Sequence, residues 1–199
     1  MASQGRFLGY TPSGQHHTRA VGDDYPTDSR WVDVLIDHNS VGIGHDGVEL
    51  VDLAAAGPTT QLGDTLTHRG IQNRVVQCDY FDLPTWKPKV PAVYHHVTNP
   101  PYRALMEWNV QALRETPGCV ALLVGVHGLS SIKRYKAVFD PTPPTELILI
   151  PNKQLVHGQT SMFSHVWMVW DFDRTPTSTL RWAVADTSQP PLHESVKRD

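Results

Sequence analysis

Two strand-like runs enclose a predicted helix in the first half of the chain, and this order restricts the folds that the chain can adopt. The apolar runs cover residues 48–53 and 74–78. Between them, Thr59 or Thr60 can begin a helix that continues to about His68. Two successive strands joined by a helix pack as a parallel pair with a right-handed crossover. The pattern therefore predicts an α/β protein built on a parallel sheet.

Strand-like and helix-like segments alternate along most of the remaining sequence. Thr27 or Asp28 can cap the first helix, and Ser130 can cap the last one. Several strands follow one another only late in the chain, so we expect them to supply an antiparallel edge. The expected architecture has three layers, with helices on both faces of a mostly parallel sheet. The other predicted helices are 29–37, 102–115 and 130–139, and the other predicted strands are 92–98, 118–126, 146–150, 164–171 and 180–185.

The chain of 199 residues is long enough for one sizeable domain. We expect this domain to span 23–187, after a flexible polar arm at 1–22 and before a polar tail at 188–199. Residues 151–164 are expected to form a surface loop between two late strands. No internal repeat interrupts this organisation, so the sequence predicts a single functional unit.

Composition excludes several classes of protein. Hydrophobic residues make up 40% of the chain and charged residues 19%, which indicates a globular protein rather than a disordered one. No apolar run approaches the roughly 20 residues that cross a bilayer, and the first residues lack a signal-peptide core. Cys78 and Cys119 lie in strand-like runs and are expected to be reduced, so a cytoplasmic location is expected. The net charge of -3 argues against a large non-specific nucleic-acid surface.

The ends of three predicted strands carry residues suited to ligand binding. Ligands of open α/β sheets bind at the carboxyl ends of the strands. Asp52 is followed by small residues up to Gly57, which would allow a ligand to approach the backbone. Asp79 lies 22 residues after Gly57, close to the spacing at which an acid binds ribose hydroxyls. This pair favours an adenosine-containing ligand, although no Gly-x-G-x-x-Gly pattern accompanies it.

Asn99, Pro100, Pro101 and Tyr102 end the third of these strands. Two successive prolines make a stiff backbone that has carbonyl groups but no N–H donors. Asn99 adds a side-chain acceptor and donor, and Tyr102 adds a flat aromatic face. Together these groups can hold a planar ring that bears an amine, with acceptors directed at its N–H bonds.

Asn-Pro-Pro-Tyr after a hydrophobic strand resembles the catalytic motif of S-adenosylmethionine-dependent amino-methyltransferases. The likeness is greatest to the N6-adenine DNA methyltransferases of phages and bacteria, including those of restriction–modification systems. It extends over about residues 23–185, and it includes the segment Asp24-Tyr25-Pro26-Thr27 and the aromatic strand at 166–171. The resemblance implies a Rossmann-like class I methyltransferase fold and S-adenosyl-L-methionine as the cofactor. It also implies an adenine-containing DNA partner and a base that is flipped out of the duplex.

The resemblance also implies roles for individual residues. Asn99 and the Pro100 carbonyl would accept the two N–H bonds of the adenine amine and stabilise the positive charge that develops there. Tyr102 would stack on the base, and Pro101 completes the catalytic motif. The implied cofactor-binding residues are Tyr25, Pro26, Thr27, Asp52, Ala54, Ala55, Gly57, Asp79, Tyr80, Asp82 and Asn99.

The substrate side is less defined by the sequence. Lys133 and Arg134 belong to a small basic cluster, and Asn152 and Lys153 lie in the expected surface loop. All four are candidates for substrate contacts. The alternative is that they form part of an ordinary solvated surface. The same motif serves RNA and glutamine amide acceptors in similar families, so these substrates stay open. A non-catalytic binding module is a further alternative, because Gly57 is followed by Pro58 rather than by the usual second glycine pattern. The small recognition surface indicates relaxed specificity, or recognition that depends on a homodimer or a partner.

Metal binding is not expected. His16 and His17 are adjacent, as are His95 and His96. Neighbouring side chains of a strand point to opposite faces, which does not suit shared ligation of one ion. Trp167 and Trp170 lie in an apolar strand and are expected to belong to the core rather than to a base-stacking surface.

Overall fold

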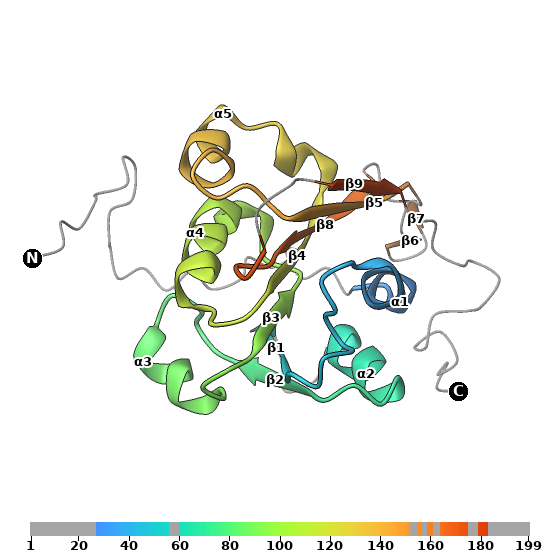
Figure 1. Cartoon of the computed structure of the whole chain (residues 1–199), viewed down its shortest axis with the longest axis vertical. Helices are drawn as coiled ribbons and strands as arrows, with labels where there is room; N and C mark the ends of the chain where they lie inside the picture. The colour runs from blue at the N-terminus through green and yellow to red at the C-terminus, as the bar shows by residue number, and fades with distance from the viewer. Residues whose placement is uncertain are drawn as a thin grey trace, which may run out of the picture.

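The computed structural model describes residues 27–55, 60–151, 155–156, 159–160, 164–174 and 179–182. Seven of its strands form one sheet in the order β2-β1-β3-β4-β8-β5-β9, and β6 pairs with β7 separately. Figure 1 shows α1 and α2 on one face of the large sheet, and α4 and α5 on the other. The elements are α1 (Ser29–His38), β1 (Leu50–Ala55), α2 (Gln61–His68), β2 (Asn73–Gln77), α3 (Leu83–Trp86), η1 (Lys87–Lys89), β3 (His95–Thr98), η2 (Tyr102–Ala104), α4 (Leu105–Glu115), β4 (Val120–Gly125), η3 (Val126–Leu129), α5 (Ile132–Arg134), η4 (Tyr135–Phe139), β5 (Glu146–Ile150), β6 (Leu155–Val156), β7 (Gln159–Thr160), β8 (His165–Trp170) and β9 (Thr179–Trp182).

The predicted fold class is confirmed. β1 pairs in parallel with β2 and with β3, and β3 pairs in parallel with β4. Antiparallel pairing is confined to the other end of the sheet, where β8 runs against both β4 and β5. β9 then pairs with β5 in parallel and forms the edge. The late strands thus supply the antiparallel part of the sheet, but they do so through one internal strand.

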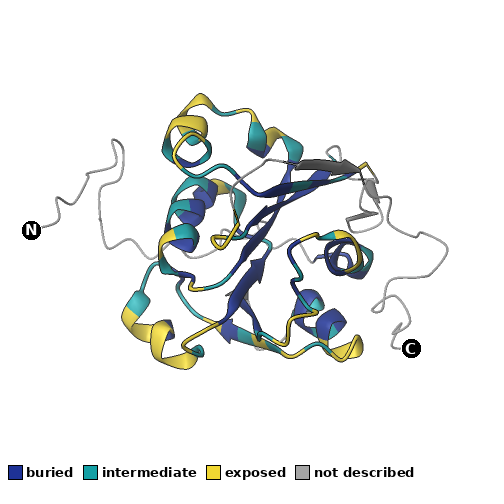
Figure 2. Cartoon of the chain, viewed as in Figure 1, coloured by how far each residue is buried: buried dark blue, intermediate teal, exposed yellow. Residues whose placement is uncertain are grey.

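Two hydrophobic layers cover the faces of the sheet, as the alternation of side chains along a strand requires. In β4, Ala121 and Leu123 pack into the layer beneath α1 and α2, whereas Leu122 and Val124 pack into the layer beneath α4. Figure 2 shows the central strands buried and the exposed residues concentrated on helices and connections. Trp167 and Trp170 are 0% and 1% exposed, so the prediction that they belong to the core is confirmed.

Asp28 caps α1, as one of the two predicted alternatives, because its side chain accepts a hydrogen bond from the Arg30 amide. Thr60 caps α2 in the same way through the Gly63 amide. The helix predicted at 130–139 is different: three residues of α5 are followed by the π-helical turn η4. Ser131 rather than Ser130 caps α5, since the Ser130 hydroxyl bonds to the preceding turn.

The strand predicted at 92–98 is shorter than expected, because the ladder begins only where the His95 amide donates to the Glu49 carbonyl. The loop predicted at 151–164 contains the small antiparallel pair β6–β7, which the sequence did not indicate. Within the described residues, no helix is both long and apolar enough to cross a bilayer. The predicted arm at 1–22 and tail at 188–199 lie outside the described residues.

Candidate active site

The carboxyl ends of the parallel strands lie at one edge of the large sheet, and the predicted site residues follow these ends. Asp79 comes two residues after β2, and Asn99 comes directly after β3. Because β8 is antiparallel, its first residue, His165, pairs with Gly125 at the end of β4. The edge therefore brings together residues from both halves of the chain, including one that the sequence did not point to.

Asp52 connects the two motifs that the sequence singled out. Its Oδ1 accepts a hydrogen bond of 2.7 Å from the Thr98 hydroxyl, and its Oδ2 accepts one of 2.9 Å from the Thr60 hydroxyl. Thr60 in turn accepts from the Gly63 amide at 3.0 Å. Thr98 directly precedes Asn99, and Thr60 directly follows residues 56–59. One carboxylate thus joins β3, which Asn99 follows directly, to α2, which begins after residues 56–59.

Asp52 is only 5% exposed and Thr98 is fully buried. Both carboxylate oxygens are turned toward protein hydroxyls, so the predicted cofactor ligand has a structural role that the sequence did not indicate. Thr60 and Thr98 were missed as contributors to the site. The sequence shows one threonine at a helix start and another just before Asn99. It does not show that both bind Asp52, because this depends on the order of the strands in the sheet.

The two prolines lie in the short connection, residues 99–101, between β3 and η2. Pro100 is buried and Asn99 is half-buried. Pro101 has extended backbone angles of φ -64° and ψ 127°, and its carbonyl accepts from the Ala104 amide at 3.2 Å. The turn η2 and then α4 follow at once. The predicted stiff platform is therefore anchored at both ends, by β3 before it and by α4 after it.

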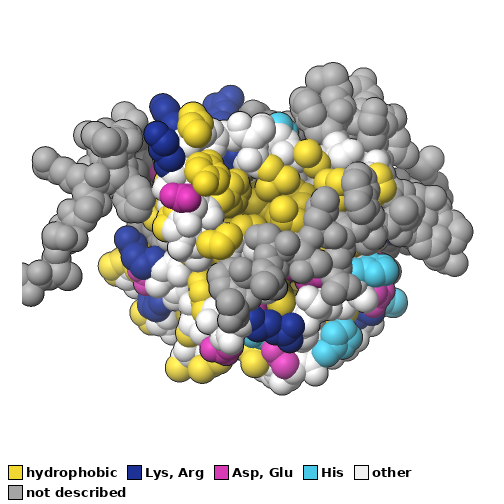
Figure 3. Space-filling view, turned by 45° about the horizontal axis from the view of Figure 1, so that its top comes forward, with side chains coloured by type: hydrophobic (Ala, Val, Ile, Leu, Met, Phe, Trp, Pro, Cys, Tyr) yellow, Lys and Arg dark blue, Asp and Glu magenta, His cyan; other side chains and the backbone are white. Residues whose placement is uncertain are grey.

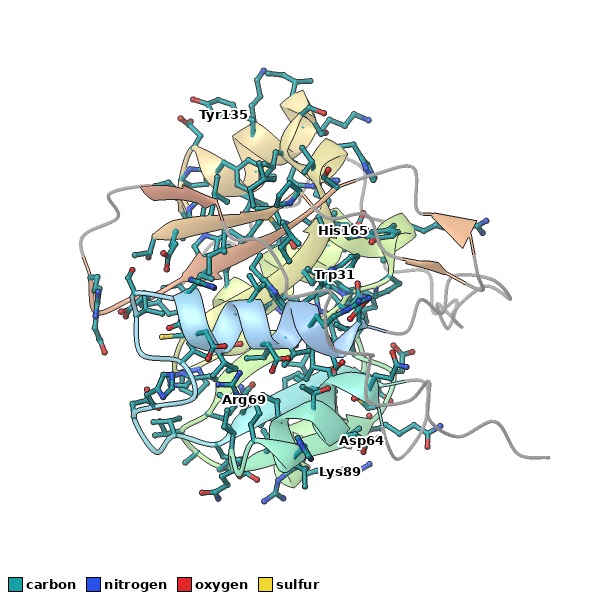
Figure 4. The ribbon with its side chains drawn as sticks, turned by 90° about the vertical axis from the view of Figure 1, so that its right-hand side faces the viewer. Trp31, Asp64, Arg69, Lys89, Tyr135 and His165 are labelled. Atoms are coloured by element: carbon teal, nitrogen blue, oxygen red, sulfur yellow. The ribbon has the colours of Figure 1, made fainter. Side chains whose placement is uncertain are left out.

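Tyr102 extends the platform toward β8. Its hydroxyl lies 3.0 Å from Nε2 of His165 in a hydrogen bond, and its ring meets the His127 ring edge-on at 5.9 Å between centroids. The His165 ring packs at a tilt against Trp31 of α1, with ring centroids 4.3 Å apart. Figure 4 shows Trp31 and His165 next to each other, with Tyr135 far from both. The aromatic part of the site thus draws on four elements.

The predicted cofactor side is only partly described. Thr27 and Asp28 are buried at the start of α1, where Asp28 also accepts from the Arg30 Nε at 2.9 Å. Asp79 is half-buried and accepts from the Phe81 amide at 3.1 Å, while Asp82 begins α3 without a side-chain capping bond. Both acids lie on one turn after β2, and Asp79 is the nearer to the strand end. Ala54 and Ala55 are the last residues of β1.

Tyr80 does not bring its ring to the site. It is 2% exposed and lies between Trp108 and Trp86, with centroid distances of 4.0 and 5.5 Å. Its carbonyl accepts from the Trp86 indole at 2.8 Å and also from Gln111. The prediction of a cofactor contact is therefore corrected for this side chain, because an aromatic directly after Asp79 serves the core beneath α4.

Arg134 also has a role within the fold, since its guanidinium donates to the Gly128 carbonyl and is half-buried. Lys133 is exposed on the same short helix. Figure 3 shows Lys and Arg side chains beside a hydrophobic patch on the face that includes the top of the molecule in Figure 1. The predicted residues Tyr25, Pro26, Gly57, Asn152 and Lys153 lie outside the described residues.

The adjacent histidines of β3 point in opposite directions, as predicted. Nε2 of His95 lies 2.7 Å from Asp46, and its Nδ1 accepts from the Cys119 amide. His96 lies on the other face beside Tyr80, and complete burial lowers its pKa to about 3. Among the residues that the structure describes, no group of three or more His, Cys, Asp or Glu side chains is arranged to hold a metal ion.

Comparison with known proteins identifies the fold. No family model and no curated protein matches the sequence. The structure is similar to a Listeria monocytogenes protein described as a candidate class I S-adenosylmethionine-dependent methyltransferase, with a TM-score of 0.57 and 13% identity over 86% of this chain and 69% of that one. A predicted O-methyltransferase from Agrobacterium tumefaciens also matches, with a TM-score of 0.42 and 12% identity over 80% of this chain and 86% of that one. The first likeness establishes the class I methyltransferase fold.

Proposed function

We propose that the protein transfers a methyl group from S-adenosyl-L-methionine to the exocyclic amino group of adenine in DNA. The observation that carries this proposal is the position of Asn99 at the carboxyl end of β3, between the buried Asp52–Thr98 pair and the tethered Tyr102. This arrangement occurs at the edge where sheets of this class bind their ligands. The class I methyltransferase fold of the chain supports the choice of cofactor.

The described residues fit this cofactor. When bound, S-adenosylmethionine supplies a methyl group that its sulfonium centre already activates. Asp79 offers a half-buried carboxylate at the end of β2, next to the end of β1, where Ala55 pairs with Gln77. A carboxylate at this place can accept hydrogen bonds from ribose hydroxyls. Thr60 and Asp52 hold the start of α2 against the same edge.

The acceptor side follows from the groups around Asn99. An adenine amine is a weak nucleophile, because its lone pair is delocalised into the ring. The Asn99 side-chain oxygen and the Pro100 carbonyl would accept its two N–H bonds, and so favour the geometry in which the nitrogen can attack. Tyr102 would stack on the base, which has to leave the duplex to reach this depth.

A nucleic-acid acceptor is supported by one cationic side chain next to the platform and by two more on a later segment. Arg103 is exposed directly after Tyr102, and Lys133 and Lys136 are exposed on the segment that follows β4. Such groups can contact phosphates, which position a substrate without reading its sequence. RNA and protein amides are the competing acceptors, and they are separated from DNA by experiment.

The test measures binding and transfer separately. Calorimetry with S-adenosylmethionine is expected to give saturable binding, and labelled methyl groups are expected in N6-methyladenine of DNA. Absence of binding at millimolar cofactor would leave a non-catalytic module, and label only in RNA or protein would refute the DNA assignment. Asn99→Ala is expected to abolish transfer while cofactor affinity changes little. Asn99→Asp, which keeps an acceptor oxygen, serves as the matched control and is expected to retain part of the activity.

A further inference from the structure

His165 occupies a fixed position at the platform. It is 7% exposed, and as the first residue of β8 it pairs with Gly125 on one side and with Ile150 on the other. Beyond this register, the Val126 amide donates to the Ser164 carbonyl at 3.0 Å and so extends the pairing past the strand. The backbone of His165 is therefore held by two neighbouring strands.

The imidazole ring is held as well. It packs against the Trp31 ring, with the centroids 4.3 Å apart and the ring planes tilted by 36°. Trp31 is itself tied to β8, because its carbonyl accepts from the Trp167 indole at 2.8 Å. Trp31 and Trp167 are 2% and 0% exposed, so little room is left for either ring to move. Nε2 of His165 is thus presented to the Tyr102 hydroxyl from a rigid support.

The Tyr102 ring lies at the start of η2, directly after the platform. Tyr102 is half-buried, and its hydroxyl is the part of the side chain farthest from the backbone. The hydrogen bond to His165 holds this far end, and it therefore restricts the direction in which the side chain leaves the backbone. The His127 ring, with its centroid 5.9 Å from that of Tyr102, gives the same ring a second contact.

We propose that His165 is a positioning residue for methyl transfer, which fixes the position of the Tyr102 ring through the hydroxyl hydrogen bond. This inference rests on the proposed function, because the position of the ring matters only if a planar acceptor stacks on Tyr102. His165 does not touch the reacting atoms in this assignment. It couples the platform to β8 and α1, so the acceptor is held relative to the rest of the sheet.

A double-mutant cycle tests the coupling in the full-length protein. His165→Phe keeps a ring that can pack against Trp31 but removes the hydrogen bond. Tyr102→Phe removes the same hydrogen bond and leaves the rest of the tyrosine ring in place. Each variant is expected to lower kcat with unmethylated DNA by about three- to tenfold, the range for loss of one hydrogen bond. The double variant is expected to lose no more than either single variant. The dissociation constant of S-adenosylmethionine is expected to stay within about twofold of wild type.

Two further variants complete the test. His165→Gln retains a hydrogen-bonding side chain and is expected to recover most of kcat. Tyr94→Phe is the matched control. Tyr94 is buried and directly precedes β3, at the opposite end of the strand from Asn99, and loss of its hydroxyl is expected to leave kcat unchanged.

Additive losses in the cycle, or full activity of Tyr102→Phe, would overturn the assignment of His165. So would a loss of cofactor binding in His165→Phe alone, because the residue would then be structural. A wild-type protein that methylates no DNA would overturn the proposed function, and this inference with it. An active wild type with additive variants would overturn only the role of His165.

Discussion

Replacement of Asp52 by asparagine should weaken the fold and the site together. The substitution exchanges one carboxylate oxygen for an amide group and removes the charge that Thr60 and Thr98 both contact. A hydrogen bond to a charged group contributes about 1.5–3 kcal/mol, and the new amide can restore part of it by donating to a hydroxyl. We therefore expect Asp52→Asn to lower the free energy of unfolding by about 1–2 kcal/mol. With a typical dependence on denaturant, the urea midpoint should fall by about 0.5–1 M.

The two threonine hydroxyls that Asp52 binds should affect different steps of the proposed reaction. Thr98→Val removes the hydroxyl beside Asn99 and is expected to lower kcat about tenfold or more, because small displacements of reacting groups are costly. Thr60→Val removes the cap of α2 and is expected to raise the cofactor dissociation constant, with a further stability loss of about 0.5–2 kcal/mol. Urea unfolding, calorimetry and single-turnover transfer measure these quantities. A wild-type urea midpoint for Asp52→Asn, or equal effects of both valine variants on the same parameter, would refute the reasoning.

Three further predictions concern the scaffold. Burial lowers the folded pKa of His96 to about 3, whereas the unfolded pKa is near 6.5. The contribution of His96 to the free energy of unfolding should therefore be complete above pH 6.5 and should fall by about 2 kcal/mol between pH 7 and pH 5. Urea unfolding should show this pH dependence in the wild type, and His96→Gln should abolish it. Gly63→Ala would place its Cβ 2.5 Å from the Val75 side chain. This clash should lower the free energy of unfolding by about 1–3 kcal/mol, which thermal unfolding would record as a lower melting temperature. Arg69→Met removes the ion pair with Asp37, which links the end of α2 to α1. The free energy of unfolding should fall by at most about 1 kcal/mol, and by less in high salt, as urea unfolding at two salt concentrations would show.

Local patterns were enough to predict the parallel part of the fold. The unit of β1, α2 and β2 follows from apolar runs, a capping threonine and a crossover of suitable length, all of which lie close together in the sequence. The antiparallel position of β8 is different, because it depends on pairing across about 45 residues with β4. An apolar run shows that a strand is buried, but it does not show which neighbours the strand has. This is why the late strands were predicted as an edge, whereas β8 lies within the sheet.

The candidate site could be located from the sequence where one short motif marks it, but not where distant residues meet. Asn99 and Tyr102 were recognised from four adjacent letters, and the structure brings them to the expected edge. Tyr80 was misplaced because its position after Asp79 does not reveal the tryptophans that enclose its ring. His165 was missed because a histidine at the start of an apolar strand gives no sign of a partner 63 residues away.

The antiparallel strand β8 gives the two sides of the site a common support. Trp167 holds the Trp31 carbonyl, and His165 holds the Tyr102 hydroxyl, from positions two residues apart on one buried strand. α1 begins with Thr27 and Asp28 in the segment expected to face the cofactor. A shift of β8 would therefore move the acceptor platform and the start of α1 in the same sense, which preserves their relative position. On the opposite side of the edge, Asp52 links β3 to α2 in a comparable way. Under the proposed function, transfer depends on such fixed relations between donor and acceptor, because the sulfonium centre of the cofactor already activates the methyl group.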